Sequence, residues 1–213
     1  MTIEWIQLDP IVSWILRLAL AALFATAAAH KLRDLRGFRQ TLSDYEILPR
    51  LFVMPAAIGL VAFEVLIAID LATGLISSLV TATTAGTVSG STTTVGTVGT
   101  APALSPWAGL AATGLLVIYG LAIGINLLRG RSEIDCGCLG PAARQPLSSW
   151  LLARNGILAF GAALTSLPLS SRSLHPIDGI TLLGGVIVLA LLFNSVNGLA
   201  SDPSRWPAPE GLS

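Results

Sequence analysis

Two cysteines separated by a single residue are the side chains of this sequence best suited to chemistry. Cys136 and Cys138 are the only cysteines among 213 residues, and Gly137 stands between them. Thiols this close in sequence can reach the Cα separation of about 4.4 to 6.8 Å that a disulfide requires, and the small ring that forms is strained and easily reduced. The spacing therefore predicts a pair that opens and closes reversibly, in preference to a permanent disulfide.

The charged neighbours of the two thiols act in opposite directions. Arg131 and Arg144 would stabilise a thiolate, whereas Asp135 would oppose one. Two other interpretations of the pair stay open. The cysteines could be small hydrophobic residues without a chemical role, or they could bind a metal together with His30, which leaves a four-ligand shell incomplete, so no metal site is predicted.

Long apolar stretches make up most of the chain around the cysteines. Charged residues account for 11% of the sequence and hydrophobic residues for 53%, whereas a soluble domain is about 25% charged. A helix needs about 20 apolar residues to cross roughly 30 Å of hydrocarbon. Stretches of this kind occupy residues 10–29, 51–77, 106–128, 150–168 and 177–197. The sequence thus predicts an all-α integral membrane bundle of about five transmembrane helices in the lipid bilayer, and excludes a cytosolic enzyme.

The remaining segments connect these spans. Residues 1–200 are expected to form a single transmembrane domain, followed by a short polar tail at 201–213. Apolar residues recur at helical spacing within 30–50, which predicts an amphipathic surface helix there. Residues 81–100 are rich in Thr, Gly and Ser and carry no charge, so a flexible loop is expected.

The distribution of basic residues predicts an orientation. Most Lys and Arg residues lie in the first and third connections and in the tail, and such residues in short loops resist translocation. An external N-terminus and a cysteine segment at the cytoplasmic face are therefore expected. The 12 basic and 12 acidic residues cancel, and no basic run is interleaved with aromatic residues, so no nucleic-acid partner is expected.

Apart from Asp178 at the start of the last span, four charged residues lie within the predicted spans. Arg17 and Asp70 lie at similar depths in neighbouring spans, which predicts an intramembrane ion pair, with a proton or ion pathway as the alternative. Glu64 is nearer mid-membrane and about 120° around the helix from Asp70, so it needs a partner of its own or stays protonated. Arg154 could extend to the interface, pair with Glu64, or lie beneath the thiols.

An ordered set of polar, aromatic and cysteine residues runs between residues 10 and 168. In chain order the set comprises His30-Lys31-Leu32, Phe38, Tyr45 to Pro49, Glu64, and Asp135-Cys136-Gly137-Cys138 with Gly140. It resembles the MauE branch of the DoxX-like membrane proteins, and the cysteine motif is its most specific part. The resemblance implies a DoxX-like four-helix core plus one helix, in the bacterial cytoplasmic membrane.

The same resemblance implies a role with a thioredoxin-fold partner, in disulfide formation or in maturing an exported enzyme of the methylamine dehydrogenase type. The catalytic pair would be Cys136 and Cys138, and the supporting residues would be Asp135, Gly137, Arg154, Glu64 and Lys31. Two cysteines allow no internal relay, so a partner protein or an oxidant must handle the second electron pair. A quinone is one such oxidant by analogy with vitamin K epoxide reductase-like proteins. The alternatives are a non-catalytic assembly factor or carrier, and a small-solute transporter that uses Glu64 and Asp70.

Overall fold

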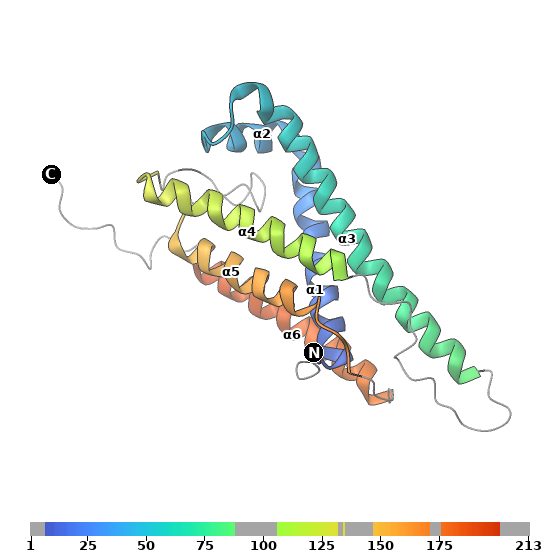
Figure 1. Ribbon diagram of the computed structural model, residues 1–213. Helices are drawn as coiled ribbons and strands as arrows, with labels where there is room; N and C mark the ends of the chain where they lie inside the picture. The colour runs from blue at the N-terminus through green and yellow to red at the C-terminus, as the bar shows by residue number, and fades with distance from the viewer. Residues whose placement is uncertain (1–6, 88–105, 132–133, 135–146, 171–175, 201–213) are drawn as a thin grey trace, which may run out of the picture.

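Six α-helices follow one another in the computed structural model, which describes residues 7–87, 106–131, 134, 147–170 and 176–200 (Figure 1). The helices are α1 (Pro10–Arg33), α2 (Leu35–Asp44), α3 (Arg50–Thr87), α4 (Pro106–Leu128), α5 (Ser149–Leu164) and α6 (Pro176–Ala200). Four of them, α1, α3, α4 and α6, are long and apolar enough to cross a membrane. The predicted all-α, multi-pass membrane architecture is confirmed.

Helix α5 is shorter than the span predicted at residues 150–168. It has 16 residues, which corresponds to about 24 Å, and it ends at Leu164. Pro168 gives the reason, because a proline disfavours helical geometry in the residue before it and cannot donate to a helical hydrogen bond. The chain beyond α5 instead bonds to the N-terminal segment, where Leu8 donates its N–H to the carbonyl of Pro168 at 2.9 Å. The start of α1 and the end of α5 therefore lie at the same end of the bundle.

Helix α1 begins at a strong capping signal and ends later than predicted. The Asp9 side chain accepts the Ile11 N–H at 2.8 Å, and Pro10 occupies the first turn, as is typical of helix N-termini. The helix runs to Arg33, beyond the predicted end at residue 29, and thereby includes Lys31. Asp34 then caps the following helix, and the amphipathic segment predicted within 30–50 is confirmed as α2.

Helix α3 also exceeds its predicted length. It has 38 residues and continues to Thr87, so the prediction of a loop was wrong for residues 81–87. No proline or charged residue interrupts the chain there, and extending an existing helix by one residue is much easier than starting one. Residues 88–105, which include the remainder of the predicted loop, and the tail 201–213 lie outside the described residues.

Four of the six helices pack as two pairs, and the other two pack against them. Helix α1 lies along α3, and α4 lies along α5, with α6 against α1 and α2 across the start of α3 (Figure 1). Buried apolar side chains from four helices fill the centre, including Leu20, Phe24, Leu71, Leu115 and Ala162. Large apolar side chains also cover the outside of the bundle, such as Leu66, Leu121 and Ile157, each more than 60% exposed. An exposed apolar surface of this extent is the surface that contacts lipid.

Gly109 permits the closest approach between α4 and the end of α5. A Cβ atom at this position would lie 2.4 Å from Ser166 Oγ, 2.5 Å from Thr165 Oγ1 and 3.0 Å from the carbonyl of Ala162. Gly109→Leu should therefore lower the free energy of unfolding by about 1–3 kcal/mol, the usual cost of overpacking. Denaturant unfolding in mixed micelles measures this loss. Gly114→Leu is the matched control, because a Cβ there meets nothing within 4 Å; equal losses in both variants would contradict the assignment.

Candidate functional site

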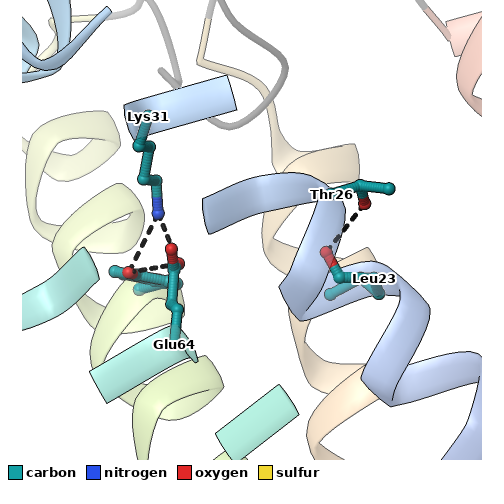
Figure 2. Close-up of polar contacts among 5 residues, drawn as sticks. Leu23, Thr26, Lys31 and Glu64 are labelled. Carbon is teal, nitrogen blue, oxygen red and sulfur yellow. Dashed lines mark hydrogen bonds and ion pairs between the residues drawn. The ribbon is translucent and has the colours of Figure 1, made fainter. Parts of the chain in front are cut away.

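Lys31, Glu64 and Tyr119 form a buried polar cluster where α1, α3 and α4 meet. The Lys31 ammonium pairs with Glu64 Oε1 (Figure 2) and donates to the Tyr119 hydroxyl at 3.1 Å. That hydroxyl in turn donates to Glu64 Oε1 at 2.7 Å. Lys31 is 4% exposed and Glu64 is 1% exposed. The cluster thus satisfies two opposite charges in the apolar interior, where either charge alone would be costly.

Two aromatic rings complete the surroundings of the ammonium group. Lys31 Nζ lies 4.8 Å from the centroid of the Phe38 ring and 4.7 Å from that of Tyr119. A cation placed over a ring face is attracted by the electrons of the ring. Because Phe38 belongs to α2, this one lysine side chain joins α1 to α2, α3 and α4.

One oxygen of the Glu64 carboxylate remains available. Oε2 is buried and has no hydrogen-bond partner within the described part of the chain, although buried polar atoms are nearly always satisfied. A carboxylate oxygen in this state can accept a hydrogen bond from an incoming group. The cluster therefore combines a buried ion pair with a hydrogen-bond acceptor that has no partner among the described residues.

The sequence analysis identified Lys31 and Glu64 as candidate residues but did not predict that they form an ion pair. Lys31 was assigned to the connection after the first span, whereas the structure places it in the last turn of α1 with its side chain directed toward Glu64 (Figure 2). Tyr119 was missed, because a single tyrosine in an apolar span gives no signal of its own. Arg154, a proposed partner of Glu64, lies with its guanidinium 5.8 Å from the centroid of the Phe193 ring.

Arg17 links α1 to the end of α5. Its guanidinium is buried and donates from Nη2 to the carbonyl of Thr165 at 2.8 Å. Asp70 on α3 lies close enough to attract this charge electrostatically. The Arg17–Asp70 ion pair stays a prediction, and the contact with the backbone of Thr165 could not be predicted from the residue types.

The predicted redox residues Asp135, Cys136, Gly137 and Cys138 lie outside the described residues, but both ends of their segment are described. Leu147 donates its N–H to the carbonyl of Ile134 at 3.1 Å. The same two residues pack in a small apolar cluster, whose other members include Tyr45, Ile123 and Leu151. Ile134 and Leu147, which flank residues 135–146, therefore lie together beside the end of α4 and the start of α5.

Arg131 fixes the start of this segment to the connection between α2 and α3. Its Nη2 lies 2.7 Å from Glu46 Oε2, and its Nη1 donates to the carbonyl of Asp44 at 3.4 Å. The hydrogen bond from Arg131 and its positive charge lower the pKa of Glu46, and the same bond raises the pKa of Arg131. The sequence analysis predicted that the charge of Arg131 would act on the thiols, whereas in the structure Arg131 pairs with Glu46.

The Arg131–Glu46 contact predicts a dependence of stability on pH. Because the pKa of Glu46 is lowered in the folded protein, its contribution is present above the ordinary glutamate pKa of about 4.3 and is lost as the pH falls through the lowered value. Glu46→Gln should therefore be less stable than the parent chain at pH 6, and the difference should shrink as the pH falls through the lowered pKa of Glu46. Unfolding midpoints between pH 3 and 7 test this. Arg131→Gln should show the same pattern, and identical midpoints for parent and Glu46→Gln at every pH would contradict it.

Comparison with known proteins places the chain in a family. The family model described as Methylamine utilisation protein MauE matches residues 9–98 and 71–168. Methylamine utilization protein MauE of Paracoccus versutus is 34% identical over 203 residues, which cover 94% of this chain and 93% of that protein. The protein of the same name from Paracoccus denitrificans is 34% identical over 151 residues, covering 71% and 66%. That of Methylophilus methylotrophus is 25% identical over 198 residues, covering 92% and 90%.

No solved structure matches the chain significantly. The family match covers the helices that form the buried Lys31 and Glu64 cluster, and it also covers the whole cysteine segment. The resemblance inferred from the ordered motif of residues 30–140 is thereby confirmed. This multi-pass helical membrane protein belongs to the MauE family.

Proposed function

We propose that this chain is a membrane thiol–disulfide redox protein that works with a thioredoxin-fold partner in methylamine utilisation. Its task would be disulfide formation in, or maturation of, an exported enzyme of the methylamine dehydrogenase type. The observation that carries the proposal is the Cys136-Gly137-Cys138 motif, which lies in a segment whose two ends are joined by the Ile134–Leu147 hydrogen bond. The names of the related proteins support the link to methylamine.

The proposed reaction is a reversible exchange between two pairs of sulfur atoms. A thiolate of the chain attacks the disulfide of the partner, forms a mixed disulfide and releases one thiolate of the partner. The second cysteine then attacks the mixed disulfide, which closes the Cys136–Cys138 bond and releases the other thiol of the partner. The dithiol of the chain loses two electrons and two protons, and the disulfide of the partner gains them. The reverse exchange runs through the same intermediate.

A second reaction must reset the pair, because the chain has no further cysteine. Another thiol–disulfide partner can supply or accept the two electrons through the same exchange. A quinone bound in the membrane is the alternative, by analogy with other helical bundles that oxidise thiols.

The described residues on either side of the segment support the proposal. Arg131 joins the segment to the α2–α3 connection, and Tyr45 and Leu151 pack beneath its two ends. A reactive group held by a rigid frame exchanges more efficiently than one on a free chain. The basic residues of α2 lie at this same end, which supports placing the cysteines at the cytoplasmic face of the bacterial cytoplasmic membrane.

Trapping of the mixed disulfide tests the proposed function. Cys136→Ser and Cys138→Ser should each be expressed in membranes and analysed on non-reducing gels, with mass spectrometry of any cross-linked band. At least one single variant should accumulate an adduct with a thioredoxin-fold protein, because the cysteine that would resolve the intermediate is gone. The variant Cys136→Ser/Cys138→Ser is the control and should form none. Full activity and no adduct in both single variants would instead favour a non-catalytic assembly factor.

A further inference from the structure

A polar pocket of about 200 Å³ lies between α2 and the start of α3. Arg39, Gln40, Ser43 and Arg50 are the polar residues that line it. Two arginines beside one small pocket can provide several hydrogen-bond donors in planar forks, which suit the oxygens of a phosphate group. The pocket is therefore built for an anion that carries more than one oxygen.

The acidic residues near this pocket already have partners. Asp44 accepts a hydrogen bond from the Gln40 amide at 2.8 Å, and Glu46 pairs with Arg131. Arg39 and Arg50 form no ion pair with any residue that the structure describes. Neither guanidinium is thus held by a salt bridge, although the charge of Arg50 acts on Glu46 at longer range.

An apolar groove of about 380 Å³ lies deeper along the same side of α3. Leu32 and Leu35 line one wall, and Ile58, Val61 and Val65 line the other. No charged side chain contributes to the groove. Its surface suits a hydrocarbon chain.

Residues of the pocket and of the groove lie on one face of α3. Met54 lines the pocket, whereas Ile58, Val61 and Val65 line the groove, and these residues are spaced by four, three and four positions, which places them on one helical face. Met54 and Val65 lie about 16 Å apart along the helix axis, close to half of the roughly 30 Å hydrocarbon thickness. A polar site near the start of α3 thus lies in line with an apolar groove on the same helix, and the two together extend about one leaflet.

From this arrangement we propose that the chain binds an anionic glycerophospholipid, whose phosphate lies between Arg39 and Arg50 and whose acyl chain occupies the groove along α3. The charge of the pocket selects the anionic class. A zwitterionic head group would bring a cation toward two guanidinium groups, whereas a head group with net negative charge would not. The bound lipid would hold α2 against α3 beside the Arg131–Glu46 contact, where the cysteine segment begins.

Native mass spectrometry of the full-length chain in detergent tests the proposal, with phosphatidylglycerol as the probe. Phosphatidylcholine with the same acyl chains and inorganic phosphate are the comparison ligands. The parent chain should retain phosphatidylglycerol in preference to both. Arg39→Gln/Arg50→Gln should bind it at least tenfold more weakly, because two charge-assisted contacts are lost. Arg33→Gln/Arg36→Gln is the matched control, since it removes the same charge from exposed positions outside the pocket and should bind as the parent does.

A second variant tests the groove without altering any charge. It also keeps the proposal testable if Arg39→Gln/Arg50→Gln fails to fold. Ala62 lines the groove, so Ala62→Trp should fill it and weaken phosphatidylglycerol binding while leaving inorganic phosphate binding unchanged. Three results would each overturn the proposal. The first is that the parent chain binds phosphatidylcholine as tightly as phosphatidylglycerol. The second is that the pocket variant and the control arginine variant bind phosphatidylglycerol equally well. The third is that inorganic phosphate binds as tightly as the lipid and that Ala62→Trp does not change lipid binding.

Discussion

Glu64→Gln is expected to lower the free energy of unfolding by about 3–5 kcal/mol, the range observed when one partner of a buried ion pair is removed. The reason is the ammonium group that remains. Lys31 is 4% exposed and pairs with Glu64, so the variant leaves a cation in the apolar interior without its counter-charge. The aromatic contacts of Lys31 with Phe38 and Tyr119 compensate for only part of this loss. Denaturant unfolding in mixed micelles, with and without the substitution, gives the difference.

A double variant separates the ion pair from simple loss of packing. Lys31→Met/Glu64→Gln removes both charges and should regain most of the stability that Glu64→Gln loses, because no buried charge is left unpaired. Glu46→Gln is the control for a glutamate at the exposed surface and should change the unfolding free energy at pH 7 by far less. If Glu64→Gln unfolded within about 0.5 kcal/mol of the parent chain, the cluster would not hold the helices together as described.

Cys136→Ser and Cys138→Ser are each expected to abolish the biological role of the chain. In a host whose growth on methylamine depends on this protein, either variant should reduce growth and methylamine dehydrogenase activity to the level seen without the chain. The sequence has no third cysteine that could substitute, and the exchange requires both sulfurs. Growth rate and enzyme activity in cell extracts measure the effect.

Ser148→Ala provides the matched control for the cysteine variants. It lies close to the segment, and its side chain forms no capping hydrogen bond at the start of α5. It should support growth as the parent chain does. Normal growth of either cysteine variant at equal protein levels would show that the sulfurs are dispensable and that another part of the chain performs its function.

Hydropathy predicted which segments are helical more accurately than it predicted where each helix begins and ends. The stretch at residues 106–128 coincides with α4, because charged or turn-forming residues border it on both sides. The method fails where a helix continues past the charge that ends its apolar stretch, as α1 does through Lys31, since a lysine can belong to a helix and direct its ammonium to a buried partner. It also fails where a helix continues into polar but uncharged sequence, as α3 does to Thr87.

The polar contacts were harder to predict than the helices for a related reason. Depth along a span can suggest a partner only when both groups are recognised as lying within spans, and Lys31 was assigned outside one. The hydroxyl of Tyr119 and the carbonyl of Thr165 belong to residues without charge, so charge patterns do not reveal them. The cysteine motif was recognised because two cysteines one residue apart are rare enough to be informative without a structure.

The central claim is that Cys136 and Cys138 alternate between two thiols and one disulfide, and a count of free thiols tests it most directly. Membranes containing the full chain should be treated with an oxidant or a reductant and then labelled with a maleimide that adds a fixed mass to each free thiol. The account predicts two labels after reduction, none after oxidation, and complete reversal when the treatments are exchanged. Two labels under both conditions, in membranes from cells that still grow on methylamine, would contradict it.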